Sequence, residues 1–213
     1  MAEQLGKVEK PDAEKFTGKR KLYLVPLIFS GEGAPAEYVE KFNLYWKQVS
    51  EHIANLESKI GKVGHIFHES IAMAGEDGLK VVEKLNPSCH RIVREKCQSG
   101  AALEATEDKE IVEESVDWER CILMGFVSQQ VAGVVSEFYM EASRKRYEHI
   151  ARRIDETLKD GEAGILFIRE GHMVQFPGDM EVFSVAPPAL DEIHRWRRDI
   201  SLRDKRGEPE NEH

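Results

Sequence analysis

The sequence predicts an α/β fold: a mixed, mainly parallel sheet of four to five strands covered by helices, with a long helical central insertion. Three observations predict it. Runs of β-branched and aromatic residues stand near both ends of the chain, segments with helical periodicity separate them, and residues 107–159 have a helical pattern throughout. Strands separated by helices usually pair in parallel, and the helices then cover the faces of the sheet.

The 213 residues are expected to form a single α/β domain over residues 21–200. Residues 1–20 are rich in charge and carry only two large apolar side chains, so we expect a flexible N-terminal arm. Residues 201–213 are polar, and we expect a flexible C-terminal tail.

Four segments have the composition of strands. Pro26 lies in the first of them and cannot donate a hydrogen bond to a neighbouring strand, which predicts an edge position or a bulge. The segments are residues 21–29 (KLYLVPLIF), 63–71 (VGHIFHESI), 163–169 (AGILFIR) and 180–186 (MEVFSVA).

Helical segments stand between and after these strands. The clearest carries an apolar stripe at spacings of three and four residues and ends at Gly61. Residues 75–85 and a segment that Asn86 and Pro87 cap are the next two helices, and residues 189–198 form a short last one. The stripe consists of Val39, Phe42, Trp46, Val49, Ile53, Leu56 and Ile60.

The central segment is more apolar than a simple covering layer requires. Residues 122–140 are strongly apolar, with a bend expected near Gly125 or Gly133, and an amphipathic helix follows them. Such helices either cover one side of the sheet or form an interface between two subunits. The pattern therefore predicts a homodimer that associates through its central helices.

Composition excludes several classes of protein. Hydrophobic residues make up 41% and charged residues 32%, which is typical of a soluble globular chain. The net charge of −9 argues against nucleic-acid binding through bulk electrostatics, although a local basic patch could still exist, and we expect no DNA partner. Three cysteines without CxxC spacing, an N-terminus without an apolar signal region and the absence of an apolar run of about 18 residues predict a reduced, cytoplasmic protein that does not enter a membrane.

The common catalytic and cofactor motifs are absent from the sequence. There is no GxGxxG, GxxxxGK[ST], GxSxG or CxxC pattern. We therefore expect no cofactor and lean towards a protein that is not an enzyme, with its catalytic residues, if it has any, unknown.

A metal site is the first candidate. On a helix, His65, His68 and Glu69 would share one face and could hold a metal ion. On a strand, the two histidines point to opposite faces and the group is dispersed. The β-branched and aromatic composition of this segment favours the strand.

Two charged segments of the centre are further candidates. Residues 104–119 are acidic and could bind a hard cation, although a solvated helix face is the commoner explanation. A basic run could contact the phosphates of RNA or a nucleotide, or pair with the acidic segment. The basic residues are Arg144, Lys145, Arg146, Arg152 and Arg153.

The last candidate is a ligand site where strands end. In open α/β sheets, ligands gather at the carboxyl ends of the strands. Arg169, Glu170 and His172 follow a predicted strand, and His194 and Arg195 lie on the helix after the next one. These five residues would bind a small molecule if they line one pocket. A loop with ordinary turn polarity is the alternative.

Residues 144–196 resemble known proteins in pattern. RYEHIARRIDETLKDGEAGILFIREGH followed by VFSVAPPALDEIHRW resembles the α/β domains of the eukaryotic and archaeal release factor and Pelota family, and also conserved bacterial proteins of unknown function. The catalytic Gly-Gly-Gln of that family is absent, so the resemblance implies no peptide release and carries over no functional residue. It implies a binding role linked to the ribosome or RNA.

The leading prediction is thus a non-catalytic interaction protein with a protein or an RNA as partner. A small-molecule-binding protein or enzyme with a pocket at the carboxyl edge of the sheet, and a metal-binding protein, are the alternatives.

Overall fold

The structure is a computed structural model that describes residue 16 and residues 18–206, with side chains up to residue 202. Most of the predicted N-terminal arm and the last seven residues of the predicted C-terminal tail lie outside the described residues. The first strand begins at Arg20, which the sequence placed in the arm, and the last helix ends at Arg206.

Five parallel strands form one sheet in the order β3-β2-β4-β1-β5. This confirms the predicted α/β class, and it makes the sheet parallel throughout the described residues. Four strands occupy the predicted segments, whereas the two-residue β3 is too short to leave a pattern in the sequence. The strands are β1 (Arg20–Pro26), β2 (Val63–His68), β3 (Ala102–Leu103), β4 (Ala163–Ile168) and β5 (Met180–Ser184).

Pro26 does not place its strand at an edge of the sheet. Strand β1 lies between β4 and β5, but its pairing with β5 ends at Leu24 opposite Ser184. Pro26 is the last residue of β1, beyond the pairing with β5, so it needs no backbone N–H donor on the side that faces β5. The backbone N–H of the next residue, Leu27, donates to Ile168 at 2.8 Å.

Four helices cover one face of the sheet. Apolar side chains from all four pack against Tyr23, Val25, Ile165 and Phe167 of the central strands. The stripe predicted for the first helix supplies most of its buried residues. The helices are α1 (Ala36–Ile60), α2 (Gly75–Leu85), α3 (Pro87–Gln98) and α6 (Pro188–Arg206).

The opposite face is covered by the carboxyl half of α5 (Gln129–Thr157) and by the loop that joins β4 to β5. Ile150 and Ile154 of α5 pack with Leu166 and Ile168 of the sheet, and Val174 of the loop completes this smaller core. The rest of α5 extends beyond the sheet.

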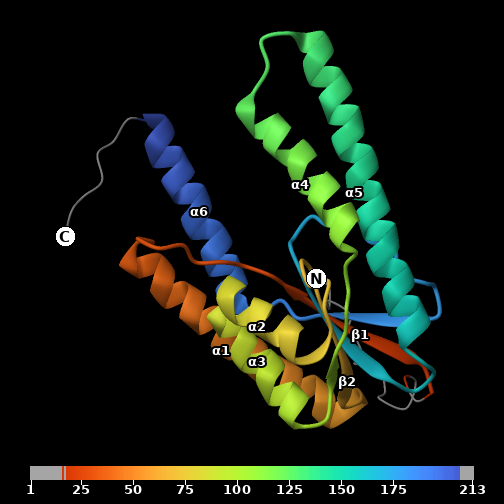
Figure 1. Ribbon diagram of the computed structural model, residues 1–213. Coiled ribbons are helices and arrows are strands. Elements are labelled where there is room, and N and C mark those ends of the chain that lie inside the picture. Colours follow the sequence, from red (N-terminus) through yellow and green to blue (C-terminus); the bar gives the residue numbers. More distant parts are fainter. Residues whose placement is uncertain (1–15, 17, 207–213) are drawn as a thin grey trace, which may run out of the picture.

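The central segment is a helical hairpin rather than one continuous helix. Helix α4 (Lys109–Met124) ends at Gly125, whose φ of +72° is a conformation that glycine adopts without strain. Ser128 then caps α5 through its side-chain oxygen. Figure 1 shows this hairpin as an arm that rises away from the sheet.

Helix α6 is longer than predicted. It continues for eight residues past the expected end at Arg198. Its first half packs on α1 through Ala189 and Ile193. Figure 1 shows its second half projecting on the same side of the molecule as the hairpin.

Candidate functional site

The carboxyl ends of β2 and β4 form the candidate ligand site. After these neighbouring strands, the chain turns to opposite faces of the sheet. Strand β2 is followed by α2 on one face, and β4 is followed by the β4–β5 loop on the other. Ligands in open α/β sheets bind where such connections diverge. His68 and Glu69 stand at the end of β2, and Arg169 and Glu170 stand at the end of β4.

Glu69 and Arg169 contact each other at this edge. The Arg169 Nε donates to the Glu69 carboxylate at 3.2 Å, and the Arg169 guanidinium lies 3.6 Å from Glu119 of α4. The Glu69 side chain is 3% exposed, whereas that of Arg169 is 39% exposed. Burial raises the pKa of the Glu69 carboxyl, and the charge of Arg169 opposes this rise.

A second ion pair beside it is closed to ligands. The guanidinium of Arg146, on α5, donates to both carboxylate oxygens of Glu107, with its Nε 3.0 Å from each. The Glu107 carboxylate also accepts the backbone N–H of Ser70 at 2.9 Å. Both side chains are almost fully buried, so this pair joins the base of the hairpin to the sheet edge.

The predicted metal residues do not gather. His65 Nδ1 lies 2.8 Å from Glu104 and its Nε2 lies 3.5 Å from Glu162, whereas His68 is buried and its Nδ1 contacts the carbonyl of Glu69. The strand geometry disperses the group, as expected for the strand alternative. Over residues 18–202, no group of three or more histidine, cysteine, aspartate or glutamate side chains could hold a metal ion.

The five predicted ligand residues come together only in part. His194 Nε2 and the Glu170 carboxylate lie 2.8 Å apart, which joins α6 to the end of β4. Arg169 instead contacts Glu69. His172 accepts the backbone N–H of Val174, and Arg195 is exposed on α6.

The basic run does not form one open surface. Arg146 is buried against Glu107, so it cannot contact phosphate. Arg144 pairs with Glu148, Lys145 pairs with Glu141, and Arg153 donates to the carbonyl of Ala105. Arg152 lies beside His149. Pairing with the acidic segment, the predicted alternative, is seen for Arg146 with Glu107 and for Lys145 with Glu114 at 4.0 Å, whereas Arg144 pairs within α5 itself.

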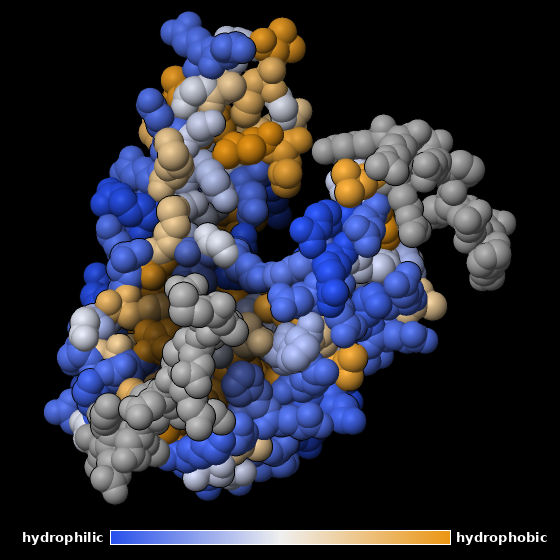
Figure 2. All heavy atoms as spheres, turned by 180° about the vertical axis from the view of Figure 1, so that it is seen from behind, coloured by the Kyte–Doolittle hydropathy of each residue, from blue (hydrophilic) through white to orange (hydrophobic). Residues whose placement is uncertain are grey.

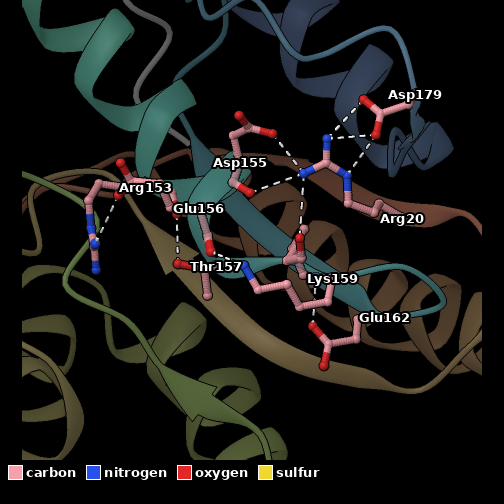
Figure 3. A network of polar contacts seen from close by, with 9 residues as sticks. Arg20, Arg153, Asp155, Glu156, Thr157, Lys159, Glu162 and Asp179 are labelled. Carbon is pink, nitrogen blue, oxygen red and sulfur yellow. Dashed lines mark hydrogen bonds and ion pairs between the residues drawn. The ribbon is translucent and has the colours of Figure 1, made fainter.

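Arg20 organises the amino edge of the sheet, a role that the sequence did not reveal. Figure 3 shows its guanidinium between Asp155 at the end of α5 and Asp179 before β5. It lies 2.7 Å from the first carboxylate and 2.8 Å from the second, and it also donates to the backbone carbonyls of Asp155 and Leu158. Its donors are occupied by the protein itself, so this network is structural.

A pocket of about 390 Å³ lies between α1 and the start of α6. Gln48, His52, Asn55 and Pro187 are among its lining residues. The Gln48 side-chain oxygen already accepts the backbone N–H of Ala189, so this N–H of the first turn of α6 is not free to bind an anion.

The outer end of the hairpin carries exposed apolar side chains. Trp118 of α4 and Phe138 of α5 stack at 4.9 Å between ring centroids, which holds the two helices together. Figure 2 shows apolar atoms gathered at this end of the arm. We call the set the apolar patch; its members are Leu123, Met124, Val127, Val131, Val134 and Phe138, each at least 47% exposed.

No helix among the described residues is long and apolar enough to cross a membrane. Comparisons with protein-family models, curated proteins and solved structures found no match, so the release-factor resemblance of residues 144–196 stays a prediction.

Proposed function

We propose that this is a non-catalytic interaction protein that forms a homodimer through the α4–α5 hairpin. The observation that carries the proposal is the apolar patch at the outer end of the arm, away from the contacts that Glu107, Glu119 and Ile150 make with the rest of the described residues. Isolated exposed apolar residues are ordinary on protein surfaces, whereas a contiguous set is typical of an interaction site.

The size of the patch matches a subunit interface. Taking roughly 150–200 Å² as the area of a whole large apolar residue, the exposed fractions of the six residues leave on the order of 700 Å² in water. A standard interface covers about 800 Å² on each partner. Two hairpins packed against each other would form a four-helix bundle, in which each helix faces apolar side chains.

A protein partner fits the hairpin better than RNA does. Arg146 is buried, and Arg144 and Lys145 are paired with glutamates of their own helix. The arm therefore offers an apolar surface and a largely neutralised basic run, whereas RNA recognition needs free cations.

Light scattering after size exclusion, over a range of protein concentrations, tests the proposal. One chain weighs 24.3 kDa, and we expect about twice this mass at micromolar concentration. Val131→Asp with Val134→Asp should give a folded monomer, because two charges in the middle of the interface leave carboxylates without partners.

Met140→Asp is the matched control. Met140 is also on α5 and is 57% exposed, but it lies nine residues after Val131 and therefore on the opposite side of the helix. It should leave the dimer intact. A wild-type monomer at tens of micromolar, or a dimer that survives both aspartates, would refute the proposal.

A further inference from the structure

The exposed apolar residues of α5 follow the spacing of a seam between two helices. Val131, Val134 and Phe138 are separated by three and then four residues, the interval at which the side chains of one helix face a second helix. Each of the three is about half exposed, although α4 packs beside α5. A helix from outside the chain would cover the exposed half of this stripe.

The same stripe becomes charged towards the base of the arm. The next three positions at this spacing carry charged side chains, each at least 45% exposed. They are Glu141, Lys145 and Glu148. The part of the stripe that favours an apolar partner therefore ends at Phe138.

The free length of the arm ends at nearly the same place. The first buried residues of α5 are Ala142 and Ser143, and Arg146 then joins the arm to the sheet edge through Glu107. A partner can therefore pack along residues 125–141, which comprise the turn and about three and a half turns of α5.

We infer that the two hairpins of the proposed homodimer pack antiparallel at their outer ends, with Val131 of one copy level with Val134 of the other. The inference rests on the proposed function and specifies how the two copies lie. In this register Phe138 of one copy is level with Val127 at the turn of the other, because a twofold axis crosses α5 midway between the two valines. Each turn then lies beside residues 137–140 of the other copy, within the free length of the arm.

The charged part of the stripe excludes the neighbouring antiparallel register. A shift of one step would bring Val134 level with Phe138 of the other copy, and Val131 would then face Glu141. Burying a carboxylate against apolar side chains costs free energy. The register centred between the two valines leaves every charged position of the stripe outside the contact.

A parallel packing of the hairpins is unfavourable for a related reason. Equal positions would then be level, so Glu141 would face Glu141 of the other copy and Lys145 would face Lys145. The sheet and the helices that cover it, which we call the sheet domain, would also lie at the same end in both copies. Each chain has a net charge of −9, and the antiparallel packing keeps the two sheet domains apart.

Distances between spin labels on α5 test the orientation. The label is attached at Glu148→Cys in a chain that also carries Cys97→Ser and Cys121→Ser, while Cys89 is fully buried and stays unlabelled. In the antiparallel register the two labels lie roughly 31 helical positions apart, so we expect about 46 Å between them. In a parallel dimer they would be level on the stripe, less than about 25 Å apart.

Gln130→Cys in the same background is the matched control. Gln130 is exposed beside Val131 and lies close to the twofold axis, so its two labels should be within about 30 Å in either orientation. Short distances at both Gln130 and Glu148 would overturn the inference and leave the proposed function standing. A wild-type monomer, or a dimer with a long distance at Gln130, would overturn both.

Small-angle X-ray scattering of the wild type is an independent measurement that needs no substitution. Two sheet domains at opposite ends of a pair of arms should give a distribution of interatomic distances with two maxima. Sheet domains that lie side by side should give one. A single maximum for a wild-type dimer would therefore contradict the antiparallel packing.

Discussion

His68 is a fully buried histidine at the end of β2. Its Nδ1–H donates to the carbonyl of Glu69, and its backbone N–H donates to the hydroxyl of Thr106 at 3.0 Å. Burial lowers the pKa of His68 from its ordinary value of 6.5 to about 4. The imidazole is therefore neutral in the folded protein at pH 7.

This shift makes stability depend on pH. Between pH 6.5 and pH 4, the unfolded chain binds a proton at His68 that the folded chain does not. The contribution of neutral His68 to the free energy of unfolding is therefore complete above pH 6.5. It is lost as the pH falls towards 4, which lowers the free energy of unfolding by about 3 kcal/mol.

Urea unfolding at several pH values should show this dependence, and His68→Phe should flatten it. Phenylalanine is similar in size to histidine and does not titrate. The readout is therefore the slope of the unfolding free energy against pH, not the unfolding free energy at a single pH. An unchanged slope in the variant would assign the acid sensitivity to other groups.

At the scale of the elements, two helical glycines are expected to respond oppositely to alanine. A Cβ on Gly78 of α2 would lie 2.2 Å from the backbone oxygen of Met73. Because the oxygen belongs to the backbone, this clash can be relieved only if the main chain moves. A Cβ on Gly133 of α5 meets nothing within 4 Å. The first position has no room for a side chain, and the second is open to solvent.

Gly78→Ala should therefore destabilise the protein by about 2–4 kcal/mol, as overpacking and backbone displacement do. Gly133→Ala should stabilise it by about 0.5–1 kcal/mol, because alanine reduces the conformational entropy of the unfolded chain. Chemical denaturation of both variants measures the difference. Equal effects at the two sites would contradict the packing of α2 on the loop before it.

At the scale of the whole molecule, the Glu107–Arg146 pair fixes the hairpin to the sheet. It joins the segment before α4 to the middle of α5, and both side chains are buried. Removal of one member leaves a buried charge without a partner, which usually costs about 3–5 kcal/mol.

Arg146→Met should thus destabilise the protein by about 3–5 kcal/mol in urea unfolding. Arg144→Met is the matched control, since Arg144 pairs with Glu148 at 3.1 Å in an exposed position and should cost less than about 1 kcal/mol. Glu107→Leu combined with Arg146→Met should recover part of the loss, because no charge is then buried. Equal costs for the two arginines would mean that the pair does not anchor the arm.

The elements with strong local patterns were predictable. Helix α1 followed from its apolar stripe, and four strands followed from their β-branched and aromatic residues. The α3 cap was predictable as well, since Asn86 accepts the backbone N–H of Cys89 at 3.1 Å as its sequence position suggests. These features depend on residues close in the chain, which a pattern records.

The candidate site was predictable only in its location. Arg169 and Glu170 do stand at the carboxyl end of a parallel strand, but the contact of Arg169 with Glu69 joins residues a hundred positions apart. The metal group was dispersed by the strand, and the burial of Arg146 was hidden within a run of ordinary surface charges. Residue type and spacing do not reveal which distant side chain faces another.

The sequence by itself determined the α/β class and the unusually apolar character of residues 122–138, because hydrophobic periodicity is a local property of the chain. Only the tertiary structure decided that this segment is folded back at Gly125 into an arm and left exposed in a single chain. An apolar pattern predicts which side chains favour burial. Which surface buries them depends on how segments distant in the sequence pack against one another.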